Sequence, residues 1–204
     1  MPKKVDHQSR RTLIADALVA VAASQGLEAV SLRHVAAAAG VSTGMVQHYF
    51  RTKDEMMAFA MSVVRERNEE RITAAIAALG PDPAPRMLLR TFITGVLPLD
   101  EQSRAYGRVA LAFLAYAAVR PDAARALRAD TQSMVEFVAG LLRAAGATAA
   151  DPEGAGAGLL AAMEGLGMYL LGGQYEPEMA LRALDAHLDL LLGPVATPGR
   201  GPGR

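Results

Sequence analysis

The stretch VSTGMVQHYFRTKDEM, residues 41–56, combines a helix-capping serine with polar and aromatic side chains close to two cations. Val46 and Phe50 lie one helical turn apart and predict a buried edge. The opposite face of the same helix carries Gly44, Gln47 and His48. A short helix with one buried edge and one polar face is typical of an element that is anchored in a core and presents side chains to a partner.

A second short helix precedes this one. Ser31 is a suitable N-cap for a helix that runs to about Ala39, and Gly40 permits a left-handed C-cap. Ser42 then caps the next helix, over residues 43–50. Two short helices joined by a Gly-Val-Ser turn form the skeleton of a helix-turn-helix, which binds DNA through its second helix.

Helical spacing continues along almost the whole chain, and no convincing strand pattern appears, so the sequence predicts an all-α protein. The first helix is expected from about Ser9 to Ser24, closed by Gly26. Thr52-Lys-Asp-Glu55 has the form of a capping box and opens a helix to about Leu79. Proline and glycine separate further helices over residues 86–97, 101–119, 122–145, 153–173 and 177–192.

These elements predict two domains and a tail. Residues 1–52 form an N-terminal three-helix helix-turn-helix DNA-binding domain, and residues 53–193 a C-terminal helical ligand-binding and dimerisation domain, with residues 53–79 as connector. Residues 194–204 are rich in proline and glycine and predict a disordered tail. Residues 1–53 hold seven basic and three acidic side chains although the whole chain is neutral, which indicates an anionic partner for the N-terminal end.

Composition excludes several classes. Cysteine is absent, which excludes disulfides and thiol catalysis and argues against a zinc cluster, so no metal and no cofactor is expected. Four histidines without an HExxH motif or a nucleophile motif argue against an all-α enzyme. The run LIADALVAVAAS imitates a signal peptide, but Asp16 interrupts it. Residues 158–173 are the best membrane candidate, yet the central Glu164 favours a buried helix, so we expect a cytoplasmic protein without a membrane partner.

The polar face of residues 43–50 has the chemistry of base readout. Gln47 can pair with adenine, Met45 can contact a thymine methyl group, and His48 can donate or accept at a base or a phosphate. Gly44 costs about 1 kcal/mol of helix propensity, which close approach to a groove wall would explain. Tyr49 and Lys53 are placed to reach phosphates. Simpler alternatives stay open for three of these side chains, because Tyr49 fits a half-buried core position and solvent would accommodate His48 or the outward-facing Arg33 equally well.

The stretch RTLIADALVAVAASQGLEAVSLRHVAAAAGVSTGMVQHYFRTKDEMM, residues 11–57, closely resembles the N-terminal DNA-binding domain of the TetR family of transcriptional regulators. The most specific part comprises Ser42, Gly44, Val46, Tyr49, Phe50 and Lys53. The wording VQHYF is closer to the choline-responsive BetI-like branch, which residues 97–117 and 161–171 resemble more weakly. The resemblance and the helical wheel together give these candidate DNA-binding residues: Ser31, Arg33, Ser42, Thr43, Gly44, Met45, Gln47, His48, Tyr49 and Lys53.

The last two helices predict a homodimer interface. Leucines recur at three- and four-residue steps in one helix, and small residues line one face of the other, which suits an intermolecular four-helix bundle. An intramolecular core is the alternative for the same pattern. The candidate interface residues are Gly158, Ala162, Gly165, Leu181, Leu184, Leu188 and Leu191.

Helices between residues 86 and 145 are expected to enclose a pocket for a small-molecule effector of unknown identity. Candidate lining residues, each equally suited to an ordinary core, are Tyr106, Phe113, Tyr116, Met134, Phe137 and Met163. The sequence therefore predicts a ligand-responsive regulator, most simply a repressor, that binds palindromic double-stranded operator DNA as a dimer. Activation uses the same fold, and a ligand-independent DNA-binding or architectural protein, whose C-terminal domain only dimerises, is the second hypothesis.

Overall fold

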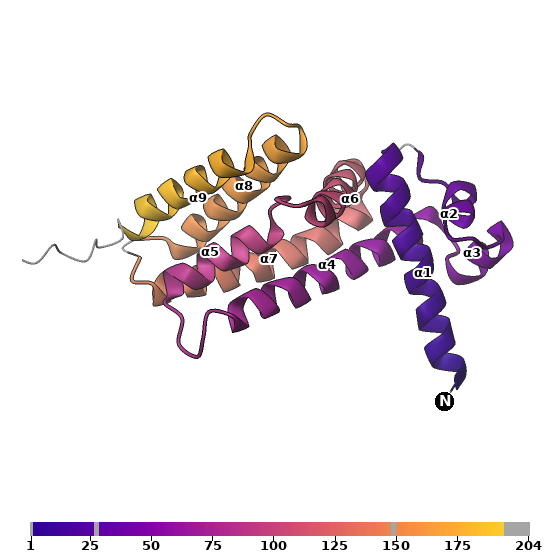
Figure 1. Ribbon diagram of the computed structural model, residues 1–204, viewed down its shortest axis with the longest axis horizontal. Coiled ribbons are helices and arrows are strands. Elements are labelled where there is room, and N and C mark those ends of the chain that lie inside the picture. The colour runs from indigo at the N-terminus through magenta and orange to yellow at the C-terminus, as the bar shows by residue number, and fades with distance from the viewer. Residues whose placement is uncertain (1, 27–28, 148–149, 194–204) are drawn as a thin grey trace, which may run out of the picture.

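The computed structural model describes residues 2–26, 29–147 and 150–193, and the regular elements within these ranges are all α-helices (Figure 1). They are α1 (Pro2–Gln25), α2 (Leu32–Ala38), α3 (Thr43–Tyr49), α4 (Lys53–Ala77), α5 (Pro85–Val96), α6 (Glu101–Ala117), α7 (Pro121–Ala144), α8 (Pro152–Leu171) and α9 (Pro177–Leu192). The prediction of an all-α fold is confirmed. The tail predicted at residues 194–204 lies outside the described residues.

The first helix is longer than the sequence predicted. It begins at Pro2, well before the start expected at Ser9, and ends just before Gly26, whose φ of +80° reverses the chain. Proline is well tolerated at the first helical position, and no glycine interrupts the residues that follow it. The bounds of the other helices agree with the predicted ones to within two residues.

The turn between α2 and α3 has the geometry of a Schellman motif. Gly40 adopts a φ of +64°, and its N–H group donates to the Ala37 carbonyl at 3.2 Å. The N–H group of Val41 donates to the Ala36 carbonyl at 3.0 Å. These two hydrogen bonds satisfy carbonyls at the end of α2 and set the direction in which the chain enters α3.

Two clusters of buried side chains hold the molecule together. The first joins α1, α2, α3 and the first half of α4 to Tyr106, Val109 and Phe113 of α6. The second joins α5, α7, α8 and α9. The boundary expected at residues 52 and 53 therefore falls inside the first cluster, which extends into the C-terminal half through α6.

Figure 1 shows α2 and α3 at one end of the molecule, with α1 crossing between them and the C-terminal helices. Helix α4 spans roughly 37 Å at 1.5 Å per residue and runs from this end along the C-terminal helices. Helices α8 and α9 pack on each other and lie farthest from α3. Helix α6 contacts α1, α4, α7 and α8, so it lies between the two clusters.

Candidate nucleic-acid interface

Helix α3 is held by a cap at its start and a buried edge along its length. The Ser42 side chain accepts a hydrogen bond from the Met45 N–H group at 3.1 Å. Val46 and Phe50 are fully buried in the first cluster, as the sequence predicted. Burial of side chains of this size contributes about 1.5–3 kcal/mol each, so a helix of seven residues keeps one fixed face outward.

The outward face of α3 is polar and exposed to solvent. Thr43, Gly44, Gln47 and His48 are exposed, and Met45 is 37% exposed. A Cβ atom added at Gly44 would meet only the Ser42 Oγ atom, at 3.9 Å. Packing within the chain therefore does not require glycine at this position, whereas close approach of an external partner would.

Tyr49 lies at the edge of this face between two histidine rings. It is half-buried against the first cluster, in the position that either a core tyrosine or a phosphate contact would take. Its ring centroid lies 4.7 Å from that of His7 and 5.2 Å from that of His48, and both contacts are edge-to-face. His7 belongs to the part of α1 that the sequence did not predict as helix, so this contact was missed.

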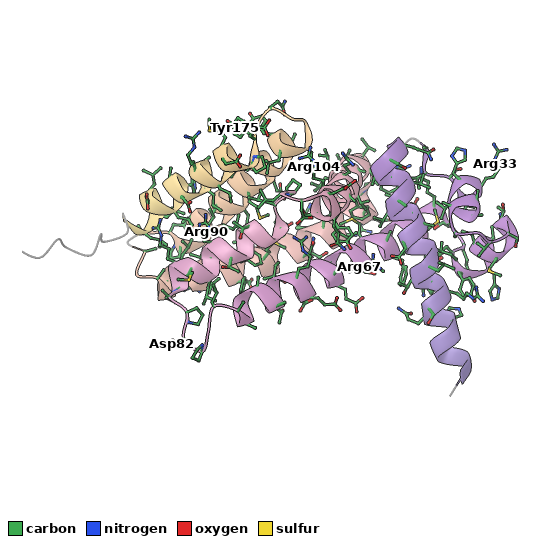
Figure 2. All side chains as sticks on the ribbon, in the orientation of Figure 1. Arg33, Arg67, Asp82, Arg90, Arg104 and Tyr175 are labelled. Atoms are coloured by element: carbon green, nitrogen blue, oxygen red, sulfur yellow. The ribbon has the colours of Figure 1, made fainter. Side chains whose placement is uncertain are left out.

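Three further candidates lie in the elements on either side of α3. Lys53 is exposed at the first position of α4. Ser31 caps α2 by accepting a hydrogen bond from the His34 N–H group at 3.2 Å. Arg33 is exposed and projects from α2 into solvent at this end of the molecule (Figure 2). The structure thus brings the ten candidate DNA-binding residues to the end of the molecule that carries α2 and α3.

Glu55 ties the junction between α3 and α4 to α1. Thr52 accepts a hydrogen bond from the Glu55 N–H group at 3.0 Å, which confirms the predicted cap. The Glu55 carboxylate accepts from the N–H group of Arg51, one residue before the cap, whereas a standard capping box uses the cap residue itself. Glu55 also lies 4.0 Å from Arg11, whose guanidinium lies 4.3 Å from the Phe59 ring centroid.

Polar contacts join α6 directly to α1 and α4. Arg67 of α4 pairs with Asp16 of α1 at 2.6 Å and also interacts with Tyr106 of α6. Burial alone would lower the pKa of Arg67, but these partners raise it. The Arg108 side chain donates to the Ala23 carbonyl of α1 at 3.1 Å. Figure 2 shows Arg67 at the junction of α4 and α1.

A further contact of this kind lies at the far end of α6. The hydroxyl of Tyr116 donates a hydrogen bond to Asp54 in the first turn of α4. Burial and the Asp54 carboxylate raise the pKa of Tyr116, so the tyrosine stays protonated and keeps its donor. The guanidinium of Arg120 lies 3.9 Å from the same ring centroid. Helix α6 is therefore attached to α1 near its middle and to α4 near its C-terminal end.

The six residues predicted to line an effector pocket do not come together. Tyr106 and Phe113 lie in the first cluster, and Tyr116 is buried beside Asp54. Met134 and Phe137 lie on the side of α7 that faces solvent, where they are 37% and 48% exposed. Met163 lines both of the cavities that lie beside α8, and the other five residues line neither.

Two cavities lie beside α8. The first, of about 130 Å³, opens between the end of α5, α6 and α8. It is lined by Val96, Leu97, Pro98, Gly107, Ala110, Leu111, Leu114, Met163, Glu164, Gly167, Met168 and Leu171. The second, of about 280 Å³, lies between α8 and α9 and includes Ala162, Gly165 and His187. The first cavity has almost entirely apolar walls, which helical spacing alone does not distinguish from core.

The predicted dimer residues divide into two groups. Leu184 and Leu188 are buried in the second cluster, and Leu191 packs against it, so the intramolecular alternative is correct for this part of the leucine pattern. The reason is that α9 packs its leucines on α5 and α8. Leu181, Ala162 and Gly165 are partly exposed, and Gly158 is exposed with open space around it. Exposed apolar side chains near these positions are Met168, Tyr169, Met179 and Leu190.

Helix α8, Pro152–Leu171, is long and apolar enough to cross a membrane by length and composition, and 28% of that stretch is buried. The helix expected to be buried is therefore buried along one side only. Within the described ranges, no group of three His, Cys, Asp or Glu side chains could hold a metal ion.

Two capped helices, a Schellman turn and an exposed polar face on the second helix define a helix-turn-helix regulator of transcription. The family profile described as bacterial regulatory proteins, tetR family, matches residues 14–58. The profile described as BetI-type transcriptional repressor, C-terminal, matches residues 85–193. The chain belongs to the TetR family of transcriptional regulators and carries a BetI-type C-terminal domain.

Individual relatives agree with this assignment. The chain is 31% identical over 203 residues to the HTH-type transcriptional regulator BetI of Burkholderia thailandensis, covering 96% of this chain and 100% of that protein. It is 37% identical over 122 residues to PksA of Bacillus subtilis, covering 60% of this chain and 58% of PksA. A solved transcriptional regulator from Rhodococcus sp. Rha1 matches with a TM-score of 0.80 at 35% identity, covering 89% of this chain and 95% of that one.

Proposed function

We propose that this regulator is a repressor that binds a pseudo-palindromic operator as a homodimer and is released from it by a small-molecule effector. The observation that carries the proposal is the outward face of α3, which is polar, exposed and fixed by the burial of Val46 and Phe50. Regulators of this family bind DNA, form dimers and bind small molecules. A repressor of this kind acts on the chromosome, and hence in the cytoplasm, and needs neither a metal nor a cofactor.

Each DNA-facing residue has a proposed role. Thr43, Gly44, Gln47 and His48 enter the major groove, where Gln47 can pair with adenine and Gly44 lets the helix backbone approach closely. Tyr49 and Lys53 contact phosphates at the edge of the groove. The contacts with bases select the sequence, and the contacts with phosphates hold the helix in register.

The proposed dimer uses the exposed faces of α8 and α9. Gly158 and Gly165 leave open space on α8, and the side chains of Met179 and Leu190 on α9 are 45% and 84% exposed. Two such pairs can form an intermolecular four-helix bundle. A two-fold dimer would place its recognition helices in half-sites about one helical turn, roughly 34–36 Å, apart.

Helix α6 supports a direct route between effector and operator. It contacts α1 through Arg108 and contacts α4 through Tyr116, while its other side faces α8. In the proposed mechanism, the effector favours a state in which α6 and α4 displace the two recognition helices from operator spacing. The size of this response equals the difference in effector affinity between the two states.

A ligand-independent DNA-binding protein is the alternative hypothesis, and it expects a solid C-terminal core. The apolar cavity of about 130 Å³ between α6 and α8 favours the ligand-responsive hypothesis. Activation instead of repression would use the same contacts with DNA.

The test is a footprint on the intergenic DNA beside the gene with purified full-length protein. We expect protection of a palindrome with half-sites one helical turn apart. A variant with both Gln47→Ala and His48→Ala should lose this protection while keeping the thermal stability of the wild type, because both side chains are exposed. A wild-type protein that protects no palindrome, or a variant that protects it unchanged, would contradict the proposal.

A further inference from the structure

The larger of the two cavities, between α8 and α9, has walls that are mostly apolar. Its volume is about 280 Å³, and the buried side chains of Leu159, Met163 and Leu184 form its innermost walls. Ala162 and Gly165 line it where the chain is partly exposed. Among its described lining residues there is no lysine, arginine, aspartate or glutamate. An apolar cavity with a few polar groups is typical of small-molecule sites.

Three aromatic side chains bring polar atoms to this cavity. Tyr169 belongs to α8, Tyr175 to the loop between α8 and α9, and His187 to α9. The ring centroids of the two tyrosines lie 4.8 Å apart, with an angle of 45° between the ring planes. The N–H group of Tyr175 donates to the Tyr169 carbonyl at 3.2 Å, and Figure 2 shows Tyr175 in this loop. The backbone of the loop therefore holds the two rings together beside the cavity.

The polar atoms of these three side chains are unpaired in the part of the chain that the structure describes. No hydrogen bond or ion pair there joins the hydroxyl of Tyr169, the hydroxyl of Tyr175 or the imidazole of His187 to another residue. Each of these groups can donate a hydrogen bond, and a carboxylate can accept several hydrogen bonds at once. The tyrosine rings also add aromatic surface to the apolar walls, which suits a flat ring.

We propose that the cavity between α8 and α9 binds a small aromatic carboxylate, whose ring fills the apolar part and whose carboxylate accepts hydrogen bonds from these three side chains. The volume corresponds to roughly nine water molecules at about 30 Å³ each, which is enough for a molecule of the size of benzoate. The inference goes beyond the proposed function, because it adds a ligand site separate from the cavity between α6 and α8.

A second copy of the chain is the other candidate occupant, because Ala162 and Gly165 also belong to the predicted dimer face. The exposed side chains of α8 and α9 that such a copy could insert include those of Met168, Met179 and Leu190. These side chains would cover the three polar groups, but a thioether accepts hydrogen bonds only weakly and an alkyl group accepts none. Because a buried donor without an acceptor is destabilising, the cavity favours a carboxylate over a side chain of a second copy.

The test compares benzoate with benzamide, which has the same ring and nearly the same shape, by isothermal titration calorimetry on the full-length protein. We expect benzoate to bind about tenfold more tightly, the effect of hydrogen bonds to a charged acceptor. Tyr175→Phe keeps the ring and should lower this ratio to about three, and the double variant Tyr175→Phe/His187→Phe should lower it to about one. Tyr49→Phe, the same change at a half-buried tyrosine of α3, is the matched control and should behave as wild type.

Equal binding of benzoate and benzamide, or an unchanged ratio in Tyr175→Phe, would overturn the inference. A wild-type protein that binds neither probe would also overturn it, which is the result expected if a second copy fills the cavity. The conservative Tyr175→Phe decides the matter if the double variant does not fold. Operator affinity is measured separately without benzoate. Operator binding without benzoate binding rejects only this site, and benzoate binding without operator binding rejects only the proposed function.

Discussion

The ring of His7 in α1 packs edge-to-face against the ring of Tyr49, the last residue of α3, at a centroid distance of 4.7 Å. This contact joins the N-terminal turns of α1 to the end of α3, the proposed recognition helix. Because Tyr49 is only half-buried, its orientation depends on such neighbours as well as on the core.

His7→Ala should therefore weaken operator binding by about two- to tenfold, the worth of one aromatic pair. His7→Phe keeps the ring and should restore the affinity. His7 is exposed, so the melting temperature should not change in either variant. Fluorescence anisotropy with labelled operator measures the affinity, and equal losses in the two variants would show that packing against Tyr49 is not the cause.

Base contacts and phosphate contacts should respond differently to substitution. Gln47→Ala should reduce the preference for operator over unrelated DNA by about 1–3 kcal/mol. Lys53→Gln should weaken binding to all sequences alike and lower the salt dependence of log K by about one unit per protomer. Arg128→Gln, at an exposed residue on α7, is the charge-matched control. The opposite assignment of these two effects would show that α3 is oriented differently on DNA.

Two glycines of α8 should differ in their effect on stability. A Cβ atom at Gly156 would lie 3.2 Å from the Val135 carbonyl oxygen and 3.3 Å from the Ala139 nitrogen, both in the backbone of α7. Gly156→Ala should therefore lower the free energy of unfolding by about 1–3 kcal/mol, despite its better helix propensity. Gly158→Ala meets open space and should raise it by up to about 1 kcal/mol. Urea denaturation distinguishes these outcomes.

The same open space provides a test of the dimer. A Cβ atom at the exposed Gly158 would meet nothing of its own chain within 4 Å, so the protomer should fold normally with Gly158→Leu. If α8 packs against a second copy, the leucine should shift the protein from dimer to monomer in sedimentation experiments and abolish footprinting. Ala129→Leu, at an exposed position of α7 outside this face, is the control. A Gly158→Leu protein that remains dimeric would place the interface elsewhere.

Tyr116 should stabilise the attachment of α6 to α4. Tyr116→Phe should cost about 1 kcal/mol at pH 7 through the lost hydrogen bond to Asp54. The pKa of Tyr116 is raised in the folded state, so its contribution is complete below the ordinary tyrosine pKa of about 10 and disappears as the pH rises through the higher folded value. The difference between wild type and variant, measured by urea denaturation, should narrow above about pH 10. A difference in unfolding free energy that stays constant with pH would show that the hydroxyl proton of Tyr116 does not cause the stability effect.

Local rules of helix capping made the DNA-binding end predictable. Ser31, Ser42 and Thr52 are caps because their hydroxyl groups accept bonds from N–H groups three residues later, which depends only on neighbouring sequence. The burial of Val46 and Phe50 likewise follows from their spacing on one short helix.

The C-terminal half was less predictable, because a leucine stripe does not specify which helix covers it. Leu184 and Leu188 pack inward. Two ion pairs join α9 to α5, and the partners in each pair are far apart in the sequence. Arg90 pairs with Asp185 at 2.6 Å, and Arg86 pairs with Asp189. Nothing near either partner in the sequence indicates these pairs. Apart from Met163, the cavity residues were missed for the same reason, since Gly107 and Glu164 line one cavity only when α6 packs on α8.

The first cluster of buried side chains includes Tyr106, Val109 and Phe113 of α6, so residues of the C-terminal domain complete the core around the helix-turn-helix. A fragment that ended after α4 would leave the surface of α1 that α6 covers open to water. Chimeric regulators built by joining this helix-turn-helix to the C-terminal domain of another family member would have to carry matching residues on α6. The helix-turn-helix of this protein therefore depends on α6 for part of its packing and would not transfer to another C-terminal domain as an independent folding unit.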